Sequence, residues 1–249
     1  MLFIQMPEFL PLVFLCIAVA LLYAGVGHGG ASGYLAAMSL LSVAPEVLRP
    51  TALALNVGVS ALGTIAFVRA GCFRGRLFWP LALCALPLAY LGGCMDLDEV
   101  LFRRLLGLVL CFGFTRLLLP ERTVVRSSVP RLPILGLAGA GMGFVSGLIG
   151  VGGGVFLTPL AILLGWAKPR EAAAISAPFI LLNSLAGLAG LAGAGAPPVV
   201  HPDFPWLLAV VLAAGWIGAR WGSRIAQTRQ LRVALGFVLA LASVKLLLF

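Results

Sequence analysis

Long runs of apolar residues recur along almost the whole chain, and they limit the possible folds more than any other feature. Hydrophobic residues make up 61% of the 249 residues and charged residues only 10%. A soluble domain carries about a quarter charged residues, so this chain cannot surround a core with polar side chains. Its outer face must therefore lie in lipid. Runs of about 18 or more apolar residues are typical of transmembrane helices, and the sequence predicts an all-α polytopic membrane protein.

Ten apolar segments are separated by short polar or glycine-containing stretches. They cover residues 9–24, 31–43, 51–68, 77–94, 100–119, 132–149, 155–166, 172–194, 206–222 and 231–248. The segments 31–43 and 155–166 are short, and each follows a glycine cluster. This pattern predicts about eight full spans and two short segments.

The distribution of basic residues along the chain indicates whether the two short segments cross the membrane. The chain has 17 basic and 8 acidic residues. If all ten segments cross the membrane, most basic residues share one side, including those in 69–76, 116–131, 168–170 and 220–232. If the short segments turn back, the basic residues divide almost evenly between the two sides. The positive-inside rule favours ten crossings, with both termini outside. It also gives the basic residues a topological role, so nucleic-acid binding is not indicated.

The two halves of the chain follow the same plan. Residues 1–119 form a first membrane repeat, residues 120–131 a cytoplasmic linker and residues 132–249 a second repeat. Each repeat begins with a long span, a glycine cluster, a short segment and a loop containing proline and charge. Because each has an odd number of crossings, the second repeat is inverted relative to the first. Inverted repeats with interrupted helices are typical of secondary transporters, which bind substrate near the membrane midplane.

The glycine clusters are the first candidate site. The aligned positions are Gly27, His28, Gly29 and Gly30 in the first cluster, and Gly150, Val151, Gly152 and Gly153, followed by Gly154, in the second. Glycine tolerates positive φ, and a broken helix frees backbone N–H groups that lipid cannot satisfy. Two short helices that begin at these breaks would direct their N-termini at an anion without any charged side chain. The alternative is that the glycines only permit close helix packing.

Polar side chains near the breaks extend this site. His28 either donates to an oxyanion and carries a proton, or closes the loop with a hydrogen bond. Asn56 and Asn183, in apolar segments of the two repeats, either line the site or bridge helices, since buried amides need partners. His201 lies in a polar loop, where we expect it to be solvated.

Three hydroxyl groups complete the candidate set. Thr51 and Ser176 lie at the predicted starts of equivalent segments, and Ser32 lies at the start of the first short segment. Each either caps a helix N-terminus or offers its hydroxyl to an anion.

Both repeats resemble the TauE/SafE family of sulfite exporters. The similar stretches are GVGHGGASGYLAAMSLL with APEVLRPTALALN, and GLIGVGGGVFLTPLAILLG with KPREAAAISAPFILLNSLAG. The resemblance implies export of small sulfur-containing anions, such as sulfite or organosulfonates, driven by an ion gradient rather than by ATP. The first cluster reads GHGGAS where the family usually has a purer glycine run.

The leading prediction is therefore a secondary transporter in the bacterial inner membrane, with lipid and a small anionic substrate as partners. Protons are the expected coupling ion, and a homo-oligomer is possible. The alternative is a channel for a small anion or neutral solute. No motif for ATP binding, metal binding or intramembrane hydrolysis is present, so neither a cofactor nor enzyme activity is expected.

Overall fold

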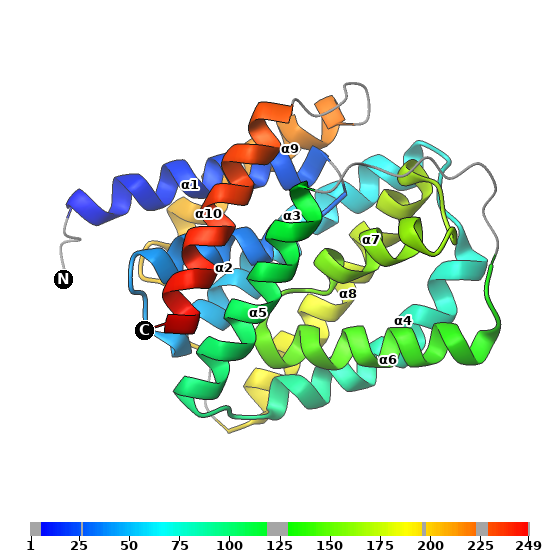
Figure 1. Cartoon of the computed structure of the whole chain (residues 1–249), viewed down its shortest axis with the longest axis horizontal. Coiled ribbons are helices and arrows are strands. Elements are labelled where there is room, and N and C mark those ends of the chain that lie inside the picture. Colours follow the sequence, from blue (N-terminus) through cyan, green and yellow to red (C-terminus); the bar gives the residue numbers. More distant parts are fainter. Residues whose placement is uncertain (1–5, 26, 119–128, 196–197, 223–228, 249) are drawn as a thin grey trace.

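The computed structural model describes residues 6–25, 27–118, 129–195, 198–222 and 229–248 (Figure 1). The predicted cytoplasmic linker lies largely outside these residues. The described part is helical and contains no strand, as predicted. Its helices are α1 (Met6–Gly25), α2 (Ala31–Leu40), α3 (Pro45–Arg69), α4 (Gly75–Cys94), α5 (Glu99–Leu118), α6 (Leu132–Ile149), α7 (Gly154–Leu163), α8 (Pro169–Gly193), α9 (Phe204–Gly222) and α10 (Arg229–Leu248).

Length and composition show that this is a polytopic membrane protein. Within the described residues, α3, α4, α6 and α8 are each long and apolar enough to cross a bilayer. Shorter apolar stretches lie in α1, α7, α9 and α10. Large apolar side chains also face outward: Leu137 is 77% exposed and Trp206 is 68% exposed. In water such a surface would be unfavourable, whereas in lipid it is the expected one.

The main helix pairs join the two halves of the chain. Helix α1 packs along α9, α4 along α6, α3 along α8 and α5 along α10. Every pair combines one helix from residues 6–118 with one from residues 132–248. The halves are therefore interlocked rather than placed side by side as separate lobes.

Close backbone contact holds α4 against α6. Gly139, Gly143 and Gly147 follow one another at four-residue spacing on α6, and a Cβ on any of them would collide with a carbonyl oxygen of α4. In lipid, where apolar burial provides little drive for association, such small-residue contacts are a principal source of helix packing.

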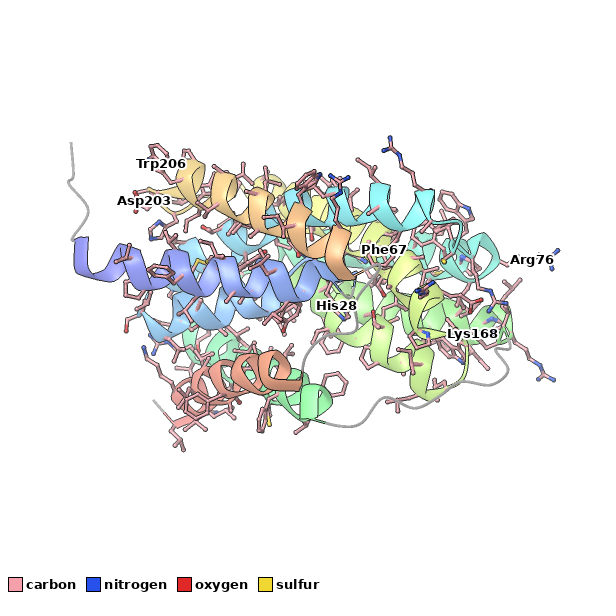
Figure 2. All side chains as sticks on the ribbon, turned by 90° about the horizontal axis from the view of Figure 1, so that it is seen from above. His28, Phe67, Arg76, Lys168, Asp203 and Trp206 are labelled. Atoms are coloured by element: carbon pink, nitrogen blue, oxygen red, sulfur yellow. The ribbon has the colours of Figure 1, made fainter. Side chains whose placement is uncertain are left out.

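The short helices α2 and α7 are each long enough for only about half of a membrane. Ten residues of α-helix span about 15 Å, against about 30 Å for the hydrocarbon core. Figure 2 places His28, in the break before α2, near the middle of the long axis. Asp203 and Trp206 lie at one end of that axis, and Arg76 and Lys168 at the other.

Neither short helix is long enough to cross the bilayer alone, which differs from the ten-crossing prediction. The side of the membrane that each loop faces stays a prediction. Helix α2 returns from the centre toward the end where α1 begins and α10 ends (Figure 1). The carbonyl groups of its last turn accept hydrogen bonds from Lys245 of α10 there. Helix α7 leads to the opposite end, where Lys168 lies (Figure 2). The loops that follow α2 and α7 therefore lie at opposite ends of the molecule, as ten crossings would also place them.

Candidate anion-binding site at the paired helix breaks

Two chain breaks interrupt the helices near the centre of the molecule. Helix α2 is preceded by Gly30 with φ of 99°, and α7 by Gly153 with φ of 81°. Gly27, Gly150 and Gly152 also have positive φ, between 75° and 85°. Residues with a Cβ rarely adopt this conformation. The backbone conformation at the breaks therefore requires glycine at these positions. Close helix packing alone would not require it.

The two breaks meet at Asn56 of α3, which is fully buried. Its Oδ1 accepts a hydrogen bond from the backbone N–H of Ala31, the first residue of α2, at 3.3 Å. Its Nδ2 donates to Oγ of Ser184 in α8 at 2.9 Å. A Cβ on either Gly29 or Gly152 would collide with the same carboxamide. Asn56 therefore contacts both breaks at once. It also bridges α3 and α8, which was one of the two roles predicted for it.

His28 connects the first break to the start of α7. Its Cδ2 lies 3.5 Å from the position that a Cβ on Gly154 would occupy. The imidazole also packs edge-on against Tyr23, with ring centroids 5.8 Å apart. The backbone N–H of His28 donates to the carbonyl of Tyr23 at 2.8 Å, which closes the turn after α1.

The N-termini of α2 and α7 both lie at this junction, and the two helices run from it toward opposite ends of the molecule (Figures 1 and 2). The first N–H groups of a helix have no intrahelical acceptor and carry the positive end of the helix dipole. Two such ends directed at one region favour an anion there. Ile180 contributes apolar surface between them, since its side chain lies against Gly29, Gly152 and Gly154.

The two halves make matching contacts around the breaks. Gly27 of the first break lies against Ala173, the fifth residue of α8, and Gly150 of the second lies against Arg49, the fifth residue of α3. Asn56 and Ile180, which both border the junction, are each the twelfth residue of their helix. At this equivalent position the first half of the chain therefore has an amide, Asn56, and the second half has an aliphatic side chain, Ile180.

The hydroxyl groups of Thr51, Ser176 and Ser32 do not lie at the helix starts where they were predicted to act as caps. Helices α3 and α8 begin at Pro45 and Pro169, earlier than predicted, because proline is well suited to the first helical turn. Thr51 and Ser176 are thus inside their helices, and the prediction that they mark helix starts is wrong. Ser32 also does not cap its helix, as α2 shows no side-chain cap.

Each hydroxyl instead joins a neighbouring element. Ser32 donates to the Tyr23 hydroxyl of α1 at 3.0 Å. Thr51 accepts from the backbone N–H of His201 at 2.8 Å. Ser176 shares a 2.7 Å hydrogen bond with Thr158 of α7. In this structure all three act between helices and loops, outside the group that surrounds Asn56.

Asn183 lies next to the second break. Its Nδ2 is 3.7 Å from the position of a Cβ on Gly153, and it donates to the carbonyl of Phe179 at 2.9 Å. At the first break, the hydroxyl of Tyr34 lies 2.8 Å from the equivalent position on Gly30. Tyr34 Oη and Asn183 Oδ1 are buried and have no hydrogen-bond partner among the described residues.

Arg49 precedes the predicted apolar segment 51–68, and in the structure it is buried, with 7% of its surface exposed. Its guanidinium donates to carbonyl oxygens of Gly147 in α6 and of Gly92, Gly93 and Met95 at the end of α4, at 2.6 to 3.1 Å. It therefore neutralises two helix C-termini beside the second break. No pattern in the sequence indicated this role, because the carbonyl groups come together only in the fold.

His201 is also less exposed than its loop predicted. Its side chain is 18% exposed, and its Nδ1 accepts from the backbone N–H of Asp203 at 3.2 Å. Burial lowers the pKa of His201 below its usual 6.5, while the nearby Asp203 carboxylate acts in the opposite direction.

Comparison with known proteins identifies the family. The family model described as sulfite exporter TauE/SafE matches residues 12–246, almost the whole chain. The chain belongs to this family. A probable membrane transporter protein of Sinorhizobium fredii, y4hK, is 42% identical over 238 residues, which cover 92% of this chain and 94% of that protein.

Two further relatives match only part of the chain. The probable membrane transporter protein YunE of Bacillus subtilis is 31% identical over 43% of this chain and 38% of its own length. MamO of Magnetospirillum gryphiswaldense, another probable membrane transporter protein, is 31% identical over 44% of this chain and 17% of its own length. No solved structure matches. Together with the apolar helices, these relatives show that this TauE/SafE member is a multi-pass membrane transporter.

Proposed function

We propose that this protein is a secondary transporter that exports small sulfur-containing anions, such as sulfite or organosulfonates, across the bacterial inner membrane. The observation that carries the proposal is the meeting of two helix N-termini, from α2 and α7, at one buried junction beside Asn56. The family description supports sulfite as the first substrate to test. The relatives named above come from bacteria, which supports the proposed membrane.

Alternating access would move the two interlocked halves against each other around the junction. Protons are the proposed coupling ion, and His28 is the proposed carrier because it places an imidazole, the side chain that most readily changes charge near neutral pH, at the breaks. No enzymatic step and no cofactor is part of this proposal. A homo-oligomer is compatible with it.

The test is sulfite efflux from proteoliposomes, with and without an imposed pH gradient. Saturable, gradient-dependent efflux supports the transporter. Flux that rises linearly with concentration and ignores the gradient would instead support the alternative, a channel. If sulfite does not move while organosulfonates do, the transporter proposal stands with a different substrate. If neither class of anion moves, the proposed function is wrong.

A further inference from the structure

The side chain of Tyr34, in α2, ends in a buried hydroxyl that has no hydrogen-bond partner among the described residues. The residue as a whole is 0% exposed. Burying a hydroxyl without a partner lowers stability, because the group loses its hydrogen bonds to water on folding and gains none in return. Native proteins contain few such groups, and each one requires an explanation. The hydroxyl of Tyr34 is therefore a candidate to bind a molecule from outside the chain.

This hydroxyl lies at the start of its own helix. Side chains of an α-helix lean toward its N-terminus, so that each one lies over the preceding turn. Tyr34 is the fourth residue of α2, and its backbone N–H donates to the carbonyl of Gly30 at 2.9 Å. Its Oη and Cζ are both 2.8 Å from the position that a Cβ on Gly30 would occupy. The unpartnered oxygen itself, at the far end of the ring, therefore lies against the residue that precedes α2.

The same turn of α2 has backbone donors that no side chain caps. The N–H of Ala31 donates to Oδ1 of Asn56. The N-cap residue is Gly30, and α2 shows no side-chain cap. The next N–H groups, those of Ser32 and Gly33, have no acceptor within the helix and lie at the positive end of its dipole. An oxygen that binds here can accept from these N–H groups and from the phenol hydroxyl together.

The second half of the chain shows that a side chain at this position needs no hydroxyl to be packed. Leu157 is the fourth residue of α7, as Tyr34 is of α2, and both are fully buried. Each helix follows a glycine with positive φ, Gly153 or Gly30. Leucine thus occupies the equivalent place without a polar atom. If Tyr34 served packing alone, an apolar side chain would do the same without burying a hydroxyl.

We propose that Tyr34 binds the transported anion at the first break, where its hydroxyl donates a hydrogen bond to an anionic oxygen that also faces the first N–H groups of α2. The inference rests on the proposed function and adds a binding residue to it. A hydroxyl forms a stronger hydrogen bond with a charged oxygen than with a neutral one. The ligand is therefore a small oxyanion. Sulfite and methanesulfonate, the inorganic and the organic case, both carry such an oxygen.

The test removes the hydroxyl and keeps the ring. Binding of sulfite and of methanesulfonate to the purified full-length protein is measured by titration calorimetry at constant pH, and the melting temperature is measured without either anion. The variants are Tyr34→Phe and, as a matched control, Ser39→Ala. Ser39 also has a buried, unpartnered hydroxyl in α2, but it lies near the other end of the helix. Each variant removes one oxygen from the same helix, and only that of Tyr34 lies beside its N-terminus.

Tyr34→Phe should bind the anion about tenfold more weakly than the native protein, since it loses a hydrogen bond to a charged group. Without anion, its melting temperature should equal or exceed the native value, because phenylalanine leaves no buried hydroxyl unpaired. Ser39→Ala should keep the native affinity. Weaker binding of sulfite alone would support the inference with an inorganic substrate, and weaker binding of methanesulfonate would support it with a sulfonate.

Two results would overturn the inference and leave the proposed function intact. The first is an affinity that is unchanged in Tyr34→Phe, or that falls equally in Ser39→Ala. The second is a lower melting temperature of Tyr34→Phe without anion, because the hydroxyl would then stabilise the protein itself. If the native protein binds neither sulfite nor methanesulfonate, the inference and the proposed function are both wrong.

Discussion

The carboxamide of Asn56 and the hydroxyl of Ser184, 128 residues apart in the chain, form a 2.9 Å hydrogen bond between the two central helices α3 and α8. The same carboxamide accepts from the first N–H of α2. The Asn56 side chain therefore contacts both helix breaks and joins α3 to α8. A mutation of Asn56 should affect both halves of the protein.

Replacing Asn56 with leucine should lower the free energy of unfolding by about 1–3 kcal/mol, because it leaves the Ser184 hydroxyl and the Ala31 N–H buried without partners. Sulfite efflux should fall strongly. Thermal unfolding in detergent and efflux from proteoliposomes measure the two effects. Ser184→Ala removes only one of the bonds, and it should have a smaller effect on both. Native stability and efflux in Asn56→Leu would show that the junction is not connected through this residue.

Gly152 and Gly71 form a matched pair for testing the second break. Their φ angles are similar, 77° and 71°, but a Cβ on Gly152 would collide with Asn56, whereas nothing lies within 4 Å of a Cβ on Gly71. Gly71→Ala should be less stable by about 1 kcal/mol and transport normally. Gly152→Ala or Gly152→Val should reach the membrane without transporting, as measured by surface labelling and efflux. Equal behaviour of the two alanine variants would mean that only backbone strain matters.

Arg49 should be the most sensitive of the charged residues. Arg49→Met leaves carbonyl groups of α4 and α6 buried without donors, so the free energy of unfolding should fall by about 3 kcal/mol or more. Arg49→Lys should rescue only part of this, since one ammonium group cannot match the planar guanidinium. The control is Arg103→Met, which breaks an exposed pair with Glu99 and should change stability by at most about 1 kcal/mol. Chemical denaturation in micelles would distinguish them, and an equal loss would contradict the assignment.

The sidedness of the loops can be tested by cysteine labelling. A variant without native cysteines would carry either Arg170→Cys, in the first turn of α8, or Val199→Cys, in the loop before α9; both positions are exposed. An impermeant maleimide added to intact cells should label Val199→Cys and leave Arg170→Cys unmodified until the membrane is opened. The positive-inside rule gives this direction. Labelling of both from one side would reject the arrangement of α7 and α8.

His201 should make stability depend on pH. Burial lowers its pKa below 6.5, so the folded protein favours the neutral imidazole. The resulting stabilisation is present above pH 6.5 and is lost as pH falls through 6.5 toward the lower folded-state value. The melting temperature should therefore drop between about pH 7.5 and about pH 5.5, and the drop should shrink in His201→Gln. A drop of the same size in that variant would assign the effect to other groups.

The sequence by itself determined the membrane environment, the number of helical segments and the position of both breaks. These follow from local properties: apolar runs require lipid, and a glycine cluster before a short apolar segment indicates a break. Asn56 was found in the same way, as a polar group in an apolar run that needs a partner. Charge placement predicted that Arg76 and Lys168 share one side and that Asp203 lies on the other, and they lie at opposite ends of the molecule.

Only the tertiary structure decided what the individual side chains contact. Arg49 looked like a loop charge, yet it binds carbonyl groups that lie 43 to 98 residues away. Thr51 was placed at a helix start, and its partner His201 is 150 residues distant. The short helices begin at breaks near the centre of the molecule, which segment length alone did not establish. Such contacts depend on how helices from the two halves pack against each other, and a local sequence pattern does not predict that packing.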